Sequence, residues 1–155
     1  MQQLDRYDKR ILTLLQADGR MSNQDLADAI GLSPSPCLRR VKSLEEAGLI
    51  TGYRALVDAK KLGYSLMALI YISMDQHTPE RFASFEGAIE AIPEVQECLL
   101  ITGQQADYQL KVIVADMDGY QNLLLNKITR IKGVTGVHTS FVLRRVVDKT
   151  EVPVD

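Results

Sequence analysis

The sequence predicts an α+β protein in two domains, and three observations support this prediction. Residues 1–50 contain three short segments whose apolar residues recur at helical spacing, with turn residues between them. Across residues 64–155 the pattern changes to strand-like and helix-like segments in the order βαββαβ. Residues 51–63 mix β-branched, aromatic and turn residues, which predicts a strand and a linker.

The first domain contains three predicted helices with recognisable ends. Leucine and isoleucine at near-helical spacing, preceded by Asp5, predict a helix over about residues 5–17. Ser22 is the N-cap of a second, short helix that ends at Gly31, and Ser33 is the N-cap of a third. Three compact helices in so short a segment are typical of helix-turn-helix DNA-binding domains.

The third predicted helix has a polar face that could meet DNA. A rotation of about 100° per residue groups Ser35, Arg39, Lys42 and Ser43 opposite the apolar side. Hydroxyls near a helix start can bind phosphates, and arginine can pair with the edge of guanine in the major groove. On charge alone, an ordinary solvated helix face is the alternative, so the interpretation depends on the three-helix context.

Charge is unevenly distributed along the chain, and its basic part includes this helix. The net charge is −2, yet residues 1–61 carry ten Lys and Arg against eight Asp and Glu, whereas residues 62–155 carry eight against twelve. Local charge is what a DNA duplex would sense. Arg40 projects to the flank of the polar face, where we expect a phosphate contact or an ion pair with Glu45 or Glu46.

The second domain predicts a ferredoxin-like sandwich. A duplicated βαβ unit of this kind gives four antiparallel strands with two helices on one face. The expected strands and helices alternate as follows: strand 66–74, helix 79–91, strand 95–102, strand 107–115, helix 117–131 and strand 134–145.

One face of this sheet would have no helix to cover it. The strands carry apolar side chains on both faces, among them Leu69, Tyr71, Leu99, Leu110, Val112 and Val142. Burying the open face against a second subunit is the natural solution, so we expect an obligate homodimer.

Several classes of protein are disfavoured. The longest apolar stretch, residues 66–72, is too short to span a bilayer, and the N-terminus lacks a signal-peptide pattern, so we expect a cytoplasmic protein without membrane partners. Cys37, Cys98, His77 and His138 do not form a metal-ligand pattern or a disulfide framework. No nucleotide-binding or hydrolase motif occurs, so we expect neither an enzyme nor a cofactor.

A series of residues in the first domain keeps one register. The series is Leu4-Asp5, Asp8, Ile11-Leu12, Leu15, Asp18-Gly19-Arg20, Leu26-Ala27, Gly31-Leu32-Ser33, Ser35-Pro36-Cys37, Arg40-Val41, Leu44-Glu45 and Gly48-Leu49-Ile50. It resembles the leucine-responsive/asparagine-regulator (Lrp/AsnC, or feast/famine) family of transcription regulators. The resemblance implies a (winged) helix-turn-helix, then a strand used in pairing subunits, then a regulation-of-amino-acid-metabolism (RAM) domain.

The resemblance also implies which residues contact double-stranded DNA. They lie at the starts of the second and third helices and along the third: Ser22, Asn23, Gln24, Ser33, Ser35, Pro36, Cys37, Arg39, Arg40 and Lys42. Among them, Cys37 also lies on the apolar side, where a small core side chain is the commoner role. Similar proteins assemble from dimers into tetramers or octamers, and we expect the same here.

In relatives, the C-terminal domain binds amino acids at subunit interfaces. Residues 102–108 lie where family members carry a glycine-rich effector loop, in which backbone N–H groups could bind a carboxylate and an aspartate could accept an ammonium group. The implied effector contacts are Gly103, Gln104, Ala106, Asp107, Tyr108 and Met117, with leucine or methionine as the first candidates. The alternative is that Gly103 and Asp107 shape a hairpin, and their spacing is one residue longer than that in family members.

These features predict an amino-acid-modulated, sequence-specific DNA-binding regulator of amino-acid-related metabolism. The alternative is a metabolite-sensing module that acts through protein partners. The two differ in salt dependence, because phosphate contacts weaken steeply as salt rises and a hydrophobic protein interface does not.

Overall fold

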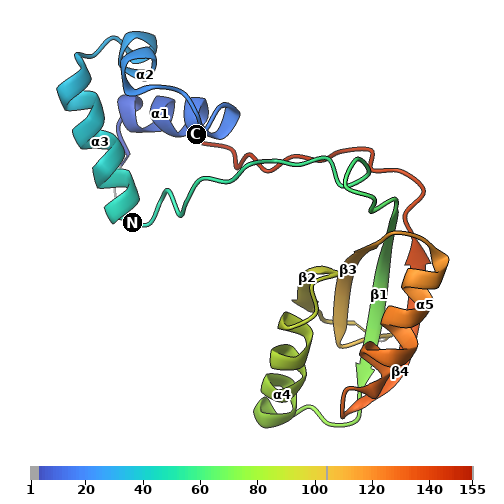
Figure 1. Ribbon diagram of the computed structural model, residues 1–155. Helices are drawn as coiled ribbons and strands as arrows, with labels where there is room; N and C mark the ends of the chain where they lie inside the picture. The colour runs from blue at the N-terminus through green and yellow to red at the C-terminus, as the bar shows by residue number, and fades with distance from the viewer. Residues whose placement is uncertain (1–3, 104, 155) are drawn as a thin grey trace. The chain divides into compact units, whose positions relative to one another are not determined.

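The computed structural model describes residues 4–103 and 105–154, which form two compact units (Figure 1). The helical unit contains the described residues up to Leu56 and those from Val147 onward, and the sheet unit is Val57–Val146. The end of the chain therefore groups with the helices, whereas the sequence placed it with the second domain.

The helical unit contains three helices, α1 (Arg6–Ala17), α2 (Asn23–Ile30) and α3 (Pro34–Glu46), close to the expected positions. Their apolar sides meet in a common core that contains Ile11, Leu12, Leu26, Ala27, Cys37 and Leu44. This packing holds α2 and α3 in a helix-turn-helix arrangement.

The residues that the sequence indicates as caps define the helix ends. The Asp5 carboxylate accepts hydrogen bonds from the backbone N–H of Tyr7 at 2.8 Å and of Asp8 at 2.9 Å. Ser22 caps α2, and Gly31 ends it in the left-handed region at φ 72°. These local interactions explain why the helix boundaries are readable from the sequence.

The tail joins the helical unit through α1. The Gln16 side chain donates to the carbonyl of Val152 at 3.0 Å and accepts from its backbone N–H at 2.7 Å. Val154 packs against the helical core. These contacts explain why the tail belongs to this unit.

The strand expected within residues 51–63 is absent from the structure. Residues 51–58 are neither helix nor strand, and residues 59–63 form turns. A strand needs a hydrogen-bonded neighbour, and the described chain supplies none to this segment.

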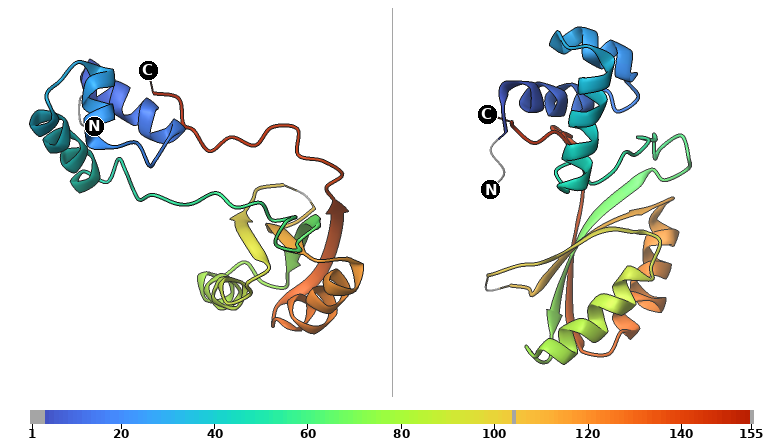
Figure 2. Two further views of the ribbon diagram at one scale, coloured as in Figure 1. Left: turned by 45° about the horizontal axis from the view of Figure 1, so that its top comes forward. Right: turned by 90° about the vertical axis from the view of Figure 1, so that its left-hand side faces the viewer.

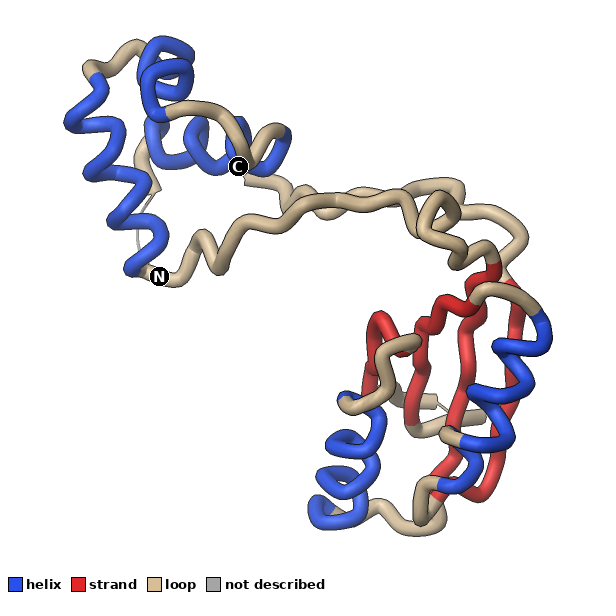
Figure 3. Tube along the Cα trace, viewed as in Figure 1, coloured by secondary structure: helices blue, strands red, loops and turns tan. Residues whose placement is uncertain are grey.

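The sheet unit has the expected βαββαβ order, with a short 3-10 helix (η1) before the last strand (Figure 3). Its elements are β1 (Leu66–Met74), α4 (Pro79–Glu90), β2 (Val95–Leu100), β3 (Tyr108–Val114), α5 (Met117–Asn126), η1 (Ile128–Arg130) and β4 (Val134–Phe141). The strands are antiparallel in the order β2-β3-β1-β4. This confirms the ferredoxin-like arrangement.

Helices α4 and α5 lie on the same side of the sheet (Figure 2). Alternate residues of β1 and β3 are buried beneath them, including Leu110 and Val112, which are fully buried. We expected apolar residues on both faces of the strands, and these two lie on the helix-covered face, in the core. Leu69 and Tyr71 are only half-buried, and Leu99 is exposed, so the open face does keep apolar side chains.

Candidate DNA-binding surface and effector site

Helix α3 has one buried side and one exposed polar side. Cys37 and Leu44 are buried in the helical core, whereas Ser35, Arg39 and Lys42 are exposed. The period of the helix produces this division, because residues three or four apart share a face. The surface formed by Ser35, Arg39 and Lys42 is called the α3 polar face below.

Cys37 was expected to contact DNA, and the structure contradicts this expectation. Its side chain is fully buried, and burial raises the pKa of its thiol. A residue on the apolar side of α3 cannot reach a ligand on the opposite side. The sequence series that named it as a contact does not separate residues needed for packing from those that touch DNA.

Arg40 forms an ion pair, one of its two expected roles, but with carboxylates at the start of α1 rather than on α3. Its Nη1 atom lies 2.8 Å from Asp8 Oδ1 and 2.8 Å from Asp5 Oδ2, and its guanidinium lies over the ring of Tyr7. The hydrogen bond to Asp8, together with the pairing to Asp5, raises the pKa of Arg40. The expected partners, Glu45 and Glu46, are not the ones it uses.

The start of α3 is tied to α2 by a side chain. Asn23 donates from Nδ2 to the carbonyl of Pro34 at 2.9 Å, so its role in the structure is to join the two helices. Ser33 is the N-cap of α3 but makes no side-chain capping hydrogen bond. Pro36 is half-buried in the first turn.

At the start of α2, two predicted DNA contacts are exposed but engaged within their own helix. Ser22 accepts from the backbone N–H of Asp25 and donates to its carboxylate at 2.6 Å. Gln24 donates to Asp28 at 3.0 Å. Both side chains lie at the surface, where a DNA backbone could meet them.

Tyr53 was not singled out from the sequence, yet it links the connector to the helices. Its hydroxyl donates to Glu45 Oε1 at 2.9 Å, and its ring lies beside Gly19. Burial, followed by the hydrogen bond to Glu45, raises the pKa of Tyr53 to about 12. The sequence signal for this contact was the presence of an aromatic residue shortly after α3.

The proposed effector loop connects β2 and β3, and Asp107 anchors it to β1. Asp107 Oδ2 accepts from the backbone N–H of Met74 at 2.7 Å, and Oδ1 lies 2.7 Å from His77 Nε2. Its backbone N–H donates to the carbonyl of Ile72 at 2.8 Å. Asp107 thus joins the start of β3 to the end of β1, a structural role different from the hairpin-shaping role considered as an alternative.

The other predicted effector residues are placed differently. Gly103 has φ 151°, Ala106 is half-buried, and Gln104 lies outside the described residues. Met117 is exposed at the start of α5, after the far end of β3. Seven residues of strand at about 3.3 Å each separate that end from Asp107, so one subunit does not bring Met117 to the loop.

Tyr108 is buried, and its side chain belongs to the core. Its ring packs against Phe85 at 4.6 Å between centroids, and its hydroxyl donates to Glu86 Oε1 at 2.7 Å. Burial, followed by the hydrogen bond to Glu86, raises the pKa of Tyr108. The ring is therefore part of the core between α4 and the sheet.

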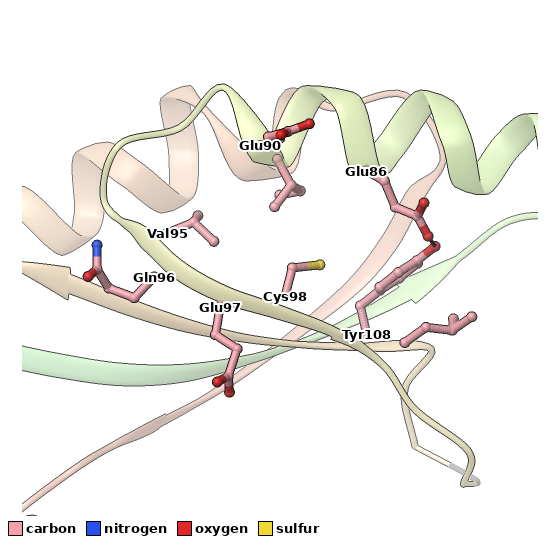
Figure 4. A pocket seen from close by; sticks show the side chains of 9 residues that line it. Glu86, Glu90, Val95, Gln96, Glu97, Cys98 and Tyr108 are labelled. Carbon is pink, nitrogen blue, oxygen red and sulfur yellow. Dashed lines mark hydrogen bonds between the residues drawn. The ribbon is translucent and has the colours of Figure 1, made fainter. Parts of the chain in front are cut away.

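A cavity of about 390 Å³ lies between α4 and β2, beside Tyr108 (Figure 4). Glu86 and Glu90 of α4 make its lining acidic, whereas the Glu97 side chain points away from α4. Cys98 also lines it, and burial followed by the charge of Glu86 raises the pKa of this thiol to about 11. A thiol with a raised pKa is a poor nucleophile at neutral pH, so this cavity does not have the character of a catalytic cysteine site.

Across residues 4–103 and 105–154, the acidic, histidine and cysteine side chains do not gather into a group able to hold a metal ion. None of the helices in these described parts combines the length and apolar character that a membrane span requires.

Comparison with known proteins identifies the family. Residues 4–51 match a winged helix-turn-helix DNA-binding family, and residues 67–152 match the Lrp/AsnC ligand binding domain. The leucine-responsive regulatory proteins of Salmonella typhimurium and Escherichia coli are each 43% identical to this chain over 143 residues, covering 92% of this chain and 87% of theirs.

Solved structures give the same result. A transcriptional regulator from Neisseria meningitidis, in complex with L-Met, has a TM-score of 0.92 at 35% identity and covers 97% of both chains. Escherichia coli AsnC has a TM-score of 0.88 at 31% identity, covering 98% of this chain and 100% of its own. The chain has a DNA-binding part followed by a ligand-binding part, and the relatives above share both parts. It therefore belongs to the Lrp/AsnC family of ligand-modulated transcription regulators, which are not enzymes.

Proposed function

We propose that the helical unit binds double-stranded DNA through the α3 polar face, and that an amino acid bound near Asp107 changes this binding. One observation carries the DNA assignment: Arg40 is held by two carboxylates, whereas its neighbour Arg39 is exposed and has no polar partner among the described residues. Such a guanidinium can pair with guanine N7 and O6. Lys42, on the same face, supplies a phosphate contact.

The start of α3 supports the same assignment. Ser33 does not use its hydroxyl to cap the helix, and Ser35 is exposed one turn from Arg39. Free hydroxyls and the positive end of a helix dipole suit DNA phosphates. The Asn23 tie to Pro34 fixes the direction in which this helix end points.

An amino acid is the effector class that fits the second domain. The matched ligand-binding family and the L-Met complex of the Neisseria relative support this class. Methionine and leucine are the first candidates, because the curated relatives are named for leucine and the solved relative holds L-Met. The Asp107 carboxylate supplies the acceptor for the ammonium group.

We further propose that the open face of the sheet joins two copies of the chain. Leu69, Tyr71 and Leu99 give this face apolar area that helices do not cover. A dimer has two α3 helices and would read half-sites about one helical turn, roughly 10 base pairs, or a multiple, apart. Because the proposed partner is DNA and the relatives are bacterial regulators, we propose that the protein acts in the cytoplasm.

The test is selection of binding sites from a random duplex pool with the full-length protein. Fluorescence anisotropy then gives the affinity for the selected site over a series of KCl concentrations, with a scrambled duplex as the control. We expect log K to fall linearly with log salt and the selected site to bind far more tightly than the scrambled one.

Either of two results would contradict the proposal. Failure to enrich any sequence would remove the specific DNA function. Binding that does not change with salt would favour an apolar protein partner instead. Addition of L-methionine or L-leucine to the same titration tests the effector assignment separately.

A further inference from the structure

Both oxygens of the Asp107 carboxylate are occupied by the chain itself. Oδ2 accepts from the backbone N–H of Met74, and Oδ1 lies 2.7 Å from Nε2 of His77. The Asp107 side chain is only 22% exposed. A ligand that needs this carboxylate therefore meets groups that already hold it.

The two partners of Asp107 differ in how firmly they are fixed. Met74 N–H is part of the backbone at the end of β1 and cannot leave without disrupting the strand. His77 lies in the loop between β1 and α4, and its side chain is 65% exposed. Its other ring contact is an edge-to-face packing on Phe82 at 6.0 Å between centroids. A rotation of the His77 side chain would free Oδ1 and leave the strands in place.

We propose that His77 is a gate on the effector site, because its imidazole occupies the Asp107 oxygen that the ammonium group of an amino acid requires. This inference rests on the proposed effector site at Asp107. Effector binding then includes displacement of the imidazole, and the measured affinity is the intrinsic affinity reduced by that competition. His77 is therefore a residue that sets effector affinity without needing to touch the bound amino acid.

The charged groups around His77 leave Asp107 as its acidic partner. Asp75, at the end of β1, pairs with Arg81 of α4 at 2.9 Å, so these two charges satisfy each other and Asp107 is the acidic partner of His77.

The experiment is calorimetric titration of the full-length protein with L-methionine and with L-leucine. Four proteins are compared: wild type, His77→Ala, His77→Gln and the control Gln76→Ala, which changes an exposed neighbour in the same loop. We expect His77→Ala to bind about two- to fivefold more tightly, the scale of a solvent-exposed pair. Gln76→Ala should match wild type, and DNA affinity without amino acid should be the same in all four.

The sign of the change separates a gate from a merely structural residue. Loss of structural support would weaken effector binding, whereas loss of a competitor strengthens it. The His77→Gln amide can still donate a hydrogen bond to Asp107, so its effector affinity should stay close to that of wild type.

The possible failures are distinguishable. If Asp107→Asn abolishes binding but His77→Ala leaves it unchanged or weaker, the gate is wrong and the effector site stands. If Asp107→Asn binds as well as wild type, or if neither wild type nor His77→Ala binds either amino acid, the proposed site is wrong and the gate with it. Binding by His77→Ala alone would support both.

Discussion

Arg40 on α3 and Asp8 on α1 form an ion pair of 2.8 Å. The helix proposed to bind DNA is therefore anchored by Arg40, whereas its neighbour Arg39 is exposed. We predict that Arg40→Ala lowers the free energy of unfolding by about 1 kcal/mol, because it removes a partly buried, charged hydrogen bond. Urea denaturation measures this change, with the exposed Arg10→Ala as the control. A stable Arg40→Ala protein that loses DNA affinity as fully as Arg39→Ala would show instead that Arg40 contacts DNA.

Arg39 and Lys42 are predicted to contribute differently to DNA binding. Arg39→Ala should cost about 1–3 kcal/mol on the selected site and relax the preference at one guanine, because a bidentate base contact is lost. Lys42→Ala should weaken binding to all sequences similarly and reduce the salt slope by about 0.9, the value for one phosphate contact. Anisotropy titrations on selected and scrambled duplexes measure both effects. Equal behaviour of the two variants would contradict this division.

The elements of the fold were predictable because local rules determine them. Asp5, Ser22 and Gly31 mark helix ends through bonds to their own neighbours, and alternation of buried side chains defines β1 as Leu66–Met74, as expected. The α3 polar face was likewise predictable from helical periodicity. Each of these features depends on residues close together in the sequence.

The errors concern contacts between distant residues. The choice of Asp5 and Asp8 over Glu45 and Glu46 as partners of Arg40 depends on how α1 packs against α3, which periodicity does not encode. The burial of Tyr108 depends on α4, and the docking of Val152 onto Gln16 joins residues 136 positions apart. Periodicity predicts which residues of α3 are exposed because the α3 polar face lies on one helix, whereas the contacts around Asp107 join several segments.

Asp107→Asn is predicted to abolish the effector response while leaving DNA binding of the empty protein intact. The amide oxygen can still accept from Met74 N–H, so the loop keeps one anchor, but the negative charge that attracts an ammonium group is lost. DNA titrations with and without L-methionine or L-leucine measure the response. A full response from the variant would exclude Asp107 as the ammonium acceptor.

The tail is predicted to stabilise the helical unit. Deletion of residues 147–155 removes both hydrogen bonds of Gln16 and the packing of Val154, and should cost about 1–2 kcal/mol. Gln16→Ala should reproduce part of the loss, whereas the exposed Gln121→Ala, in the sheet unit, should have no effect. Circular dichroism during urea unfolding measures each change. Unchanged stability of the deleted protein would mean that the tail contacts add nothing in solution.

Glu94 is predicted to make the sheet unit sensitive to acid. Its Oε1 atom lies 2.6 Å from Lys127 Nζ, and Oε2 is buried without a hydrogen-bond partner among the described residues. Burial raises the pKa of Glu94, but the hydrogen bond from Lys127 and further backbone and charge interactions outweigh it, so the pKa is lowered from 4.5. A carboxylate with a lowered folded-state pKa stabilises the protein above its unfolded pKa, and that stabilisation is lost as pH falls through the folded value.

Unfolding measured from neutral pH down to about pH 3 tests this prediction. Glu94→Gln should flatten the acid limb of the stability curve relative to wild type, because the titrating group is gone. Lys127→Met should be more destabilising at neutral pH than in acid, since it leaves a charged carboxylate partly buried without its cation until that carboxylate is protonated. If Lys127→Met costs the same stability at both pH values, the pair does not carry the acid sensitivity, and other carboxylates, such as Asp5 with its lowered pKa, would have to account for it.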